Sequence, residues 1–151
     1  MPLDPSFVGR SYRPTSVFEV GREKVREFAD AIGDASPVYR DPAAAQALGH
    51  PDTLAPPTFL TGMSLDACRA VIDDPALGLD WSRVVHGDQK FRYTRPARVG
   101  DRLQVEVVVD GVKSLAGNDV LNLRAEVRTV DGEPVTTVLT MLVARAPEEA
   151  S

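Results

Sequence analysis

Residues 59–72 decide the fold, and they read FLTGMSLDACRAVI. Apolar and small residues cover most of the circumference that this stretch would have as a helix, and its only charged residues are Asp66 and Arg69. A helix without a continuous polar face is buried inside a protein rather than laid on its surface. The stretch therefore predicts a buried central helix over 59–72, with Thr58 as its N-cap.

The second half of the chain predicts β-strands, because its apolar residues alternate with polar ones at a period of two. The pattern runs through 84–93, 103–109, 121–127 and 135–143. Turn signals separate these strands. Asp110-Gly111 indicates a bend or a bulge, Gly117-Asn118 indicates a turn, and Asp131-Gly132 indicates a hairpin.

The last of these strands is apolar on both faces. One face carries Val135, Thr137, Leu139, Met141 and Val143. Val138 and Leu142 lie on the opposite face, which indicates that this side is also partly covered.

The segments before the central helix predict further helices and a long loop. Apolar residues at helical spacing predict an amphipathic helix from Gly21 to about Ile32. A short helix is expected over 41–46, with Asp41 as its N-cap and proline at its first position. It lies within the irregular segment 33–57, and loops of this length in compact domains are usually functional.

Together these elements predict one domain that spans residues 1–151. Residues 1–16 carry three prolines, and both they and the polar tail 147–151 are expected to be extended or frayed. Helices come first, an antiparallel meander follows, and one helix is unusually buried. This order is typical of an α+β layer arrangement.

The composition is that of an ordinary globular domain and argues against several classes of protein. Hydrophobic residues make up 43% of the 151 residues, and the formal net charge of -5 argues against nucleic-acid binding. No apolar run approaches the roughly 20 residues that a membrane helix needs, and the first residues lack the features of a signal peptide. Cys68 is the only cysteine, which excludes an intrachain disulfide and suits the cytoplasm. Neither a cysteine pair nor a His-x-x-x-His spacing is present, so no structural metal site is expected.

A turn signal follows the first helix. Residues 33–39 read GDASPVY, in which glycine permits positive φ, aspartate bonds nearby backbone and proline stops a helix. The string also resembles the signature of R-specific enoyl hydratases and MaoC-like dehydratases, Gly-Asp-x-Asn-Pro-aliphatic-His. Gly33, Asp34, Pro37 and Val38 match the signature. Ser36 stands where asparagine is usual, and Tyr39 stands where the signature has its catalytic histidine.

Four further strings resemble one branch of the MaoC-like hot-dog superfamily, the HadA-type subunit of the actinobacterial (3R)-hydroxyacyl-carrier-protein dehydratase. They are VGREKVREF at 20–28, LAPPTF at 54–59, VHGDQKF at 85–91 and RPARVGD at 95–101. The resemblance implies a single hot-dog domain, in which a curved antiparallel sheet is wrapped around a buried central helix. It also implies a HadB-like partner subunit that carries the catalytic aspartate and histidine, while the A-type subunit helps to hold the acyl chain.

The chemistry explains what the missing histidine means. Dehydration of a 3-hydroxyacyl thioester needs a base for the α-proton, and an imidazole suits this task near neutral pH. A tyrosine, with an ordinary pKa of about 10, is a poor base there. Asp34 and Tyr39 are therefore expected to be vestiges of a catalytic site, and no confident catalytic residue is assigned.

The same resemblance implies where substrate and carrier would bind. The substrate-binding candidates are Pro57, Thr58, Phe59, Gly87 and Gln89. The start of the central helix could offer backbone N–H donors to a thioester oxygen in a complete site. No cofactor and no metal is expected.

Basic residues gather locally in this acidic chain. Between Arg83 and Arg98 the chain has five basic residues and one acidic residue. The alternatives are a solvated strand face or a surface for an anionic ligand, such as an acyl carrier protein or coenzyme A. The candidates for carrier binding are Lys90, Arg92, Arg95 and Arg98.

Three functions remain open. The first is an acyl-binding, assisting subunit of a (3R)-hydroxyacyl-carrier-protein or coenzyme A dehydratase in fatty acid elongation. The second is a stand-alone acyl-thioester binding protein. The third is a homodimeric hydratase or thioesterase that uses Asp34. A genomic neighbour with an intact Gly-Asp-x-Asn-Pro-x-His string would favour the first, and its absence would favour the others.

Overall fold

Four long strands form the body of the structure, which a computed structural model describes for residues 3–147. They are β3 (Val84–Tyr93), β4 (Arg102–Leu115), β5 (Asn118–Thr129) and β6 (Pro134–Ala144). Neighbours in the order β4-β5-β6-β3 pair antiparallel. Two short strands, β1 (Ser11–Tyr12) and β2 (Phe18–Glu19), pair with the outer edge of β4 and complete a six-stranded sheet.

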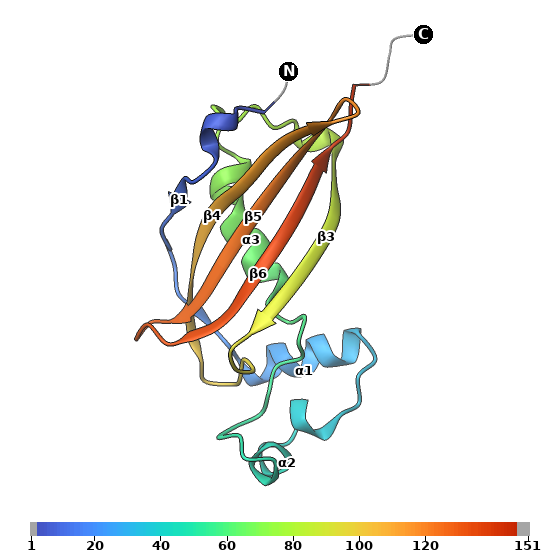
Figure 1. Ribbon diagram of the computed structural model, residues 1–151. Coiled ribbons are helices and arrows are strands. Elements are labelled where there is room, and N and C mark those ends of the chain that lie inside the picture. Colours follow the sequence, from blue (N-terminus) through green and yellow to red (C-terminus); the bar gives the residue numbers. More distant parts are fainter. Residues whose placement is uncertain (1–2, 148–151) are drawn as a thin grey trace.

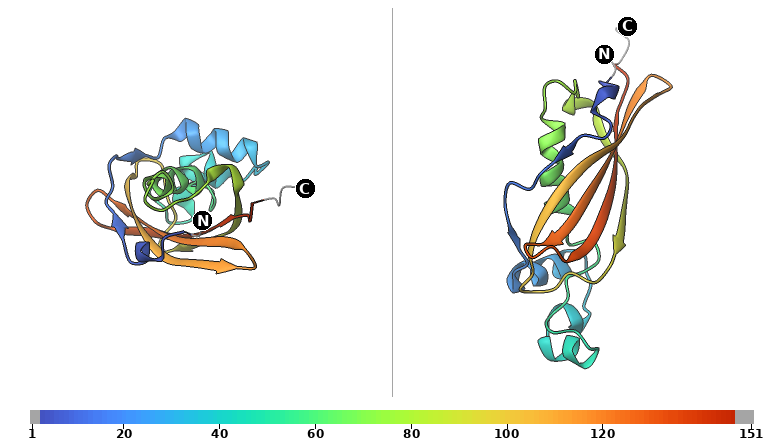
Figure 2. Two further views of the ribbon diagram at one scale, coloured as in Figure 1. Left: turned by 90° about the horizontal axis from the view of Figure 1, so that it is seen from above. Right: turned by 60° about the vertical axis from the view of Figure 1, so that its left-hand side comes forward.

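The sheet curves around one helix, α3 (Thr61–Ile72) (Figures 1 and 2). Seen from above, α3 lies in the hollow of the sheet (Figure 2). Its buried residues are Met63, Ser64, Cys68, Val71 and Ile72. The prediction of an α+β hot-dog domain with a central helix is therefore confirmed.

The start of the central helix differs from the prediction. The N-cap is Leu60 instead of Thr58, and no side chain caps the helix. Residues 57–60 form turns, in which Phe59 N–H donates to Pro56 O at 2.9 Å and Thr61 N–H donates to Thr58 O at 3.1 Å. These turn bonds close before the helical ladder begins, so the helix is two residues shorter at its start. Its outer side, with Asp66 and Arg69, is exposed.

The inner face of the sheet forms the core, and cross-strand rows show its register. One row joins Phe91, Val138, Ala125 and Val107. In β6 the inner face consists of Thr136, Val138, Thr140 and Leu142, each at most 3% exposed. The richer apolar face with Leu139, Met141 and Val143 lies outside and is partly exposed. Because both faces of β6 are apolar, the alternation pattern alone cannot show which face lies in the core.

The turns between strands follow the sequence signals. The ladder of β4 and β5 shifts register between Val109 and Gly111, so of the two expected alternatives, a bend or a bulge, the structure has a bulge. The tight turn between β4 and β5 has positive φ at Ala116 (51°) and Gly117 (80°). This backbone suits a hairpin whose twist matches that of its strands.

The first half of the chain adds a lobe beside the sheet. It contains α1 (Arg22–Ala31), the 3-10 turn η2 (Pro37–Tyr39) and α2 (Pro42–Ala47). Helix α2 projects from the body of the molecule (Figure 1). It is capped as predicted, since Asp41 Oδ1 accepts from Ala43 N–H at 2.9 Å.

The N-terminal segment is more ordered than expected. It begins with the 3-10 turn η1 (Pro5–Phe7), and Leu3 and Phe7 are buried in the core at 3% and 0% exposure. Gly9 N–H donates to Val109 O at 2.8 Å, which ties the segment to β4. The prolines of this segment indicate extended chain, so the local sequence pattern does not predict that the segment packs into the core. Of the expected polar tail, residues 148–151 lie outside the described residues.

Between α3 and β3 lies the 3-10 turn η3 (Trp81–Arg83). Among residues 3–147, no helix combines the length and the apolar character that crossing a membrane would require.

Replacing Leu60, which is 0% exposed at the start of α3, tests how much the central packing contributes. We expect Leu60→Ala to lower the free energy of unfolding by about 2–5 kcal/mol, because a buried leucine leaves a cavity. Leu48→Ala is the matched control, since Leu48 is 66% exposed, and its effect should stay within about 0.5 kcal/mol. Urea unfolding measures both, and equal losses would contradict the core assignment.

Candidate functional site

The turn after α1 places Asp34 by backbone and side-chain bonds. Gly33 adopts φ of 70°, which a glycine permits, and Asp34 N–H donates to Ala29 O at 2.9 Å. Asp34 Oδ1 accepts from Ser36 N–H at 2.9 Å, which makes an Asx turn. Arg40 fastens the turn by donating to Asp34 O at 2.7 Å and to Asp30 Oδ1 at 2.6 Å. One carboxylate oxygen of Asp34 thus has a structural role.

Tyr39 lies in η2, at the position where the signature has histidine. Its ring is partly buried against the core. Burial raises the pKa of the Tyr39 phenol, and the negative charge of Asp34 raises it further. At neutral pH Tyr39 is therefore a neutral hydrogen-bond donor, and this pair contains no base comparable to an imidazole.

The segment that leads into α3 is held from β3. Tyr93 Oη donates to Pro57 O at 2.6 Å, and burial raises the pKa of Tyr93 to about 12. Pro57 and Thr58 are exposed, while Phe59 is buried against Phe18 and Phe28 with edge-to-face rings. The first helical turn beyond them presents backbone N–H groups without intrahelical acceptors. Residues 57–59 are thus held next to the N-terminus of α3, where the helix dipole favours a negative charge.

Gly87 and Gln89 lie in β3, the edge strand that pairs only with β6 among the described strands. A register shift between His86 and Asp88 leaves Gly87 as the extra residue of a bulge. A Cβ at Gly87 would meet Met141 Cε at 2.6 Å and Val143 Cγ2 at 3.2 Å, so packing on β6 already explains the glycine. Gln89 pairs with Thr140, and within the described chain neither Gln89 Nε2 nor Thr140 Oγ1 has a hydrogen-bond partner although both atoms are buried.

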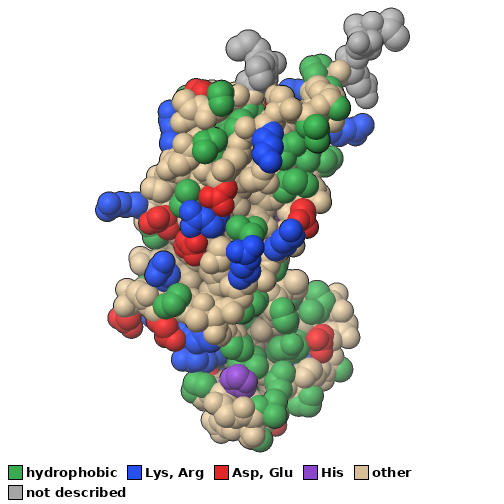
Figure 3. All heavy atoms as spheres, viewed as in Figure 1, with side chains coloured by type: hydrophobic (Ala, Val, Ile, Leu, Met, Phe, Trp, Pro, Cys, Tyr) green, Lys and Arg blue, Asp and Glu red, His purple; other side chains and the backbone are tan. Residues whose placement is uncertain are grey.

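The basic residues of this region divide into two groups. Lys90 and Arg92 lie on the outer face of β3 and are exposed, and Lys90 makes a loose ion pair with Asp88 at 3.6 Å. The Arg98 side chain is partly exposed. In Figure 3, acidic side chains lie between the basic ones on this side of the molecule.

Arg95 belongs to an internal ion network. Its guanidinium donates to both oxygens of Asp101 at 2.9 Å and to Glu133 Oε1 at 2.7 Å. The side chains of Arg95 and Asp101 are only 15% and 7% exposed. Hydrogen bonding to Asp101 raises the pKa of Arg95, and Arg95 lowers the pKa of Glu133. This geometry gives Arg95 a structural role, and the carrier-binding role expected from the sequence stays a prediction.

The loop that Arg95 anchors also positions the segment before α3. Ala55 N–H donates to Ala97 O at 2.8 Å, and Val99 N–H donates to Thr53 O at 2.9 Å. Pattern gave no sign of this pairing, because both segments are irregular. The Arg95–Asp101 pair therefore holds, through the 96–101 loop, the residues that lead to Pro57 and Thr58.

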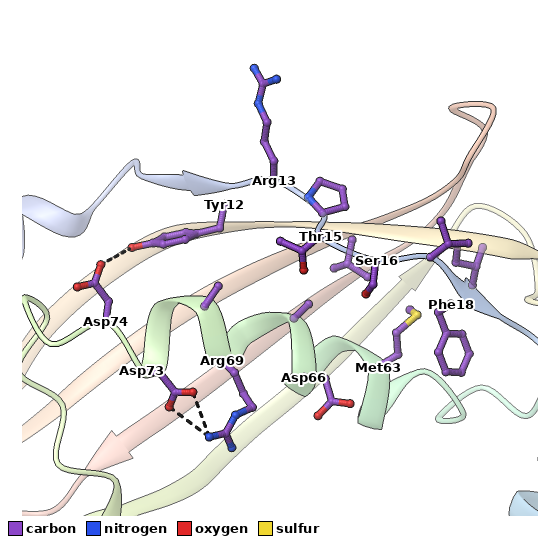
Figure 4. A pocket seen from close by; sticks show the side chains of 16 residues that line it. Tyr12, Arg13, Thr15, Ser16, Phe18, Met63, Asp66, Arg69, Asp73 and Asp74 are labelled. Atoms are coloured by element: carbon purple, nitrogen blue, oxygen red, sulfur yellow. Dashed lines mark hydrogen bonds and ion pairs between the residues drawn. The ribbon is translucent and has the colours of Figure 1, made fainter.

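A cavity of about 560 Å³ lies between α3 and the segment that joins β1 to β2 (Figure 4). Its roof is the arch, residues 13–17 between β1 and β2, and its floor includes Met63, Leu103 and Val105. Asp34 and Tyr39 do not line it. Nothing in the sequence pattern indicated this cavity, because it depends on how an irregular segment passes over a strand edge.

Among residues 3–147, the side chains of histidine, cysteine, aspartate and glutamate form no group of three that could hold a metal ion. Cys68 is buried, and burial raises the pKa of its thiol to about 12. A thiol in this state is inert rather than nucleophilic.

The comparison with known proteins identifies the family. A family model described as FAS1-like, dehydratase domain region, matches residues 6–138. The chain belongs to this family. A UPF0336 protein of Streptomyces coelicolor is 61% identical over 150 residues, covering 99% of this chain and all of that one. A UPF0336 protein of Thermobifida fusca is 49% identical over 96% of this chain and 95% of its own.

Solved structures share the hot-dog fold. A chain of the C-terminally truncated HadBC (3R-hydroxyacyl-ACP dehydratase) complex of Mycobacterium tuberculosis matches with a TM-score of 0.84 and 29% identity, over 95% of this chain and 99% of that one. A structure described as a MaoC-like dehydratase matches with a TM-score of 0.87 and 30% identity, over 97% of this chain and 44% of that one. The chain is thus a hot-dog protein of dehydratase-like type.

Removing Arg95 tests whether the ion network is structural. We expect Arg95→Met to lower the free energy of unfolding by about 3 kcal/mol, because Asp101 then stays buried without its cation. Arg92→Met is the matched control, and its effect should stay within about 0.5 kcal/mol. Urea unfolding of both variants gives the comparison, and the structural role is refuted if Arg95→Met is as stable as Arg92→Met.

Proposed function

We propose that this protein is the acyl-binding, assisting subunit of a (3R)-hydroxyacyl thioester dehydratase in fatty acid elongation, and that it works in the cytoplasm. The catalytic aspartate and histidine come from a second, HadB-like hot-dog subunit. The thioester is carried by an acyl carrier protein or by coenzyme A. The family and the similar HadBC chain support the dehydratase assignment.

The observation that carries the proposal is the state of the Asp34–Tyr39 pair. Asp34 is partly engaged in its own turn, and Tyr39 is a phenol with a raised pKa. Loss of a general base costs roughly 10²–10⁴ in rate, so this pair cannot sustain efficient dehydration near pH 7. A fold that keeps the turn but lacks the base is suited to supporting a site in a partner.

The free edge of β3 supports the pairing. β3 is the last strand of the sheet, so its outer backbone groups have no strand beside them among residues 3–147. An open edge of ten residues invites another strand. Trp81 and Val85 near this edge are 54% and 45% exposed. The match to only 44% of the MaoC-like dehydratase chain leaves length in that chain for a second unit of this size.

The remaining residues have roles around the acyl chain in this proposal. The loop before Pro57 and the helix α3 supply walls for the acyl tail. Pro57, Thr58 and Phe59 lie where the thioester end would approach the start of α3. Gly87 and Gln89 lie on β3, close to the edge where the partner would join. Lys90, Arg92 and Arg98 are available for the anionic carrier, whereas Arg95 is engaged internally.

Activity measurements test the division of labour. We expect the purified chain to turn over crotonyl or longer enoyl thioesters at background rate, because it lacks an imidazole base. Co-expression with a hot-dog protein from the same genome that has an intact Gly-Asp-x-Asn-Pro-x-His string should give a complex at least about 100-fold more active. Robust turnover by the chain alone would contradict the proposed assisting role.

Tyr39→His restores the residue that the signature expects. We expect a small gain in activity of the isolated chain, because a base without its oriented partners is only part of a site. Tyr39→Phe is the control, since it removes the hydroxyl without adding a base. A gain in Tyr39→Phe as large as in Tyr39→His would show that proton transfer at this position is irrelevant.

Charge reversal tests the carrier surface. We expect the double variant Lys90→Glu, Arg92→Glu to bind the acyl carrier protein or coenzyme A about tenfold more weakly at low salt, with a flatter salt dependence. Lys113→Glu with Arg128→Glu makes the same change in net charge on β4 and β5 and serves as the control. Equal affinities of the two double variants would contradict carrier binding by Lys90 and Arg92 and would indicate that they are ordinary solvent-exposed residues.

A further inference from the structure

The arch stands away from the sheet because it has two residues too many. Tyr12 pairs with Val107, and Phe18 pairs with Leu103. Between these pairs the N-terminal segment advances by six positions and β4 by four, so the segment carries two extra residues. The arch is these surplus residues with their neighbours, and the cavity lies under it. A smaller hollow of about 350 Å³ lies at the same gap and shares Pro14 as a wall.

The gap leaves Val105 without a strand partner on the side of the N-terminal segment, whereas on its other side Val105 pairs with Val127 of β5. Val109 N–H donates to Arg10 O at 3.0 Å, and Asp101 O accepts from Val20 N–H at 2.9 Å. The backbone N–H and C=O groups of odd-numbered residues along β4 therefore point toward the N-terminal segment. Strand alternation directs the N–H and C=O of Val105 the same way. The pairs of β4 with β1 and β2 lie on either side of Val105, and neither short strand supplies a residue opposite it. A donor and an acceptor of one residue thus lie side by side on the cavity wall.

The rest of the cavity lining combines apolar, neutral polar and charged side chains. Figure 4 shows the side chains of Thr15 and Ser16 directed from the arch toward α3, whereas Arg13 points away. Met63 and Phe18 close one end, and Tyr12 closes the other with its hydroxyl 3.5 Å from Asp74. Arg69 is engaged with Asp73 at 3.0 Å outside the arch. Asp66 also belongs to the lining and is exposed on the outer side of α3. The charged side chains of the lining are thus engaged with one another or with Tyr12, directed away, or exposed to solvent, which favours an uncharged ligand.

We propose that this cavity binds an uncharged small molecule that carries a secondary amide between two apolar groups. The amide would bond to Val105 as a neighbouring strand does, its C=O accepting from Val105 N–H and its N–H donating to Val105 O. Its apolar groups would pack on Met63, Leu103 and Phe18. A plain alkyl chain would displace water from both Val105 groups and replace neither bond, which disfavours it. The volume falls in the range of small-molecule sites.

This inference goes beyond the proposed function. The cavity shares α3 with the proposed acyl walls, but it shares no residue with the Asp34–Tyr39 turn or with the free edge of β3. Its ligand is defined by the hydrogen-bonding pattern of one backbone position. The assignment therefore stands or falls on whether Val105 itself responds to an amide.

The test is a titration of the ¹⁵N-labelled full chain with N-butylpentanamide, and in parallel with butyl pentanoate, an ester of the same length without the N–H. We expect a saturable shift of the Val105 amide resonance, with the amide bound about tenfold more tightly than the ester, the difference that one neutral hydrogen bond makes. No saturable shift at Val105, or equal affinity for the two probes, would overturn the proposal.

A variant locates the binding in the cavity. Ala70 lines the cavity on the exposed side of α3, so Ala70→Leu should narrow it and weaken amide binding at least about fivefold. Ala47→Leu makes the same change at an exposed helical position away from the cavity, and its affinity should stay unchanged. Unchanged binding in Ala70→Leu would also overturn the proposal. The amide–ester comparison uses the unaltered chain and does not depend on the folding of either variant.

Discussion

The inner face of the curved sheet is a continuous apolar surface, and covering it is the constraint on which this structure depends. Leu103, Leu121 and Leu123 of this face are at most 1% exposed, because α3 and the N-terminal segment lie over them. Apolar surface removed from water contributes roughly 25 cal/mol per Å², so this contact is the main favourable term of the fold. Phe7 shows that the cover includes residues far from α3 in the sequence.

The position of α3 depends in turn on two polar anchors. Tyr93 holds Pro57 from β3, and the Arg95–Asp101 pair holds the loop that pairs with residues 53–55. Both anchors come from the end of β3 and the loop after it, so the segment that leads into the helix is tied to the sheet. The cost of desolvating Arg95 is offset by its bonds to two carboxylates, which is the usual condition for a nearly buried cation.

The dehydratase-like architecture is thus intact around a turn that lacks its base. Asp34, Ser36 and Arg40 still make the bonds that shape the turn, and Tyr39 packs into the place of the expected histidine. The turn also holds the segment that leads toward α3, since Leu54 N–H donates to Val38 O at 2.9 Å, and the outer edge of β3 has no strand beside it among residues 3–147. A subunit that supports a partner's site needs both features, which is why the proposed assisting role fits this geometry better than autonomous catalysis.

The sequence by itself determined the α+β class, the central helix, the four long strands, an irregularity at Asp110-Gly111 and the capped helix at Asp41. Each of these depends on local periodicity or on a local turn preference, which are readable along one stretch of chain. Resemblance along the chain supplied the hot-dog fold and the exchanged catalytic position at Tyr39. Only the tertiary structure decided which face of β6 lies inside, since Leu139 and Val138 are equally apolar. It also separated Arg95 from Lys90 and Arg92, and it placed the arch over Val105. Burial and ion pairing depend on residues far apart in the chain, whose approach is decided only when the sheet closes around α3.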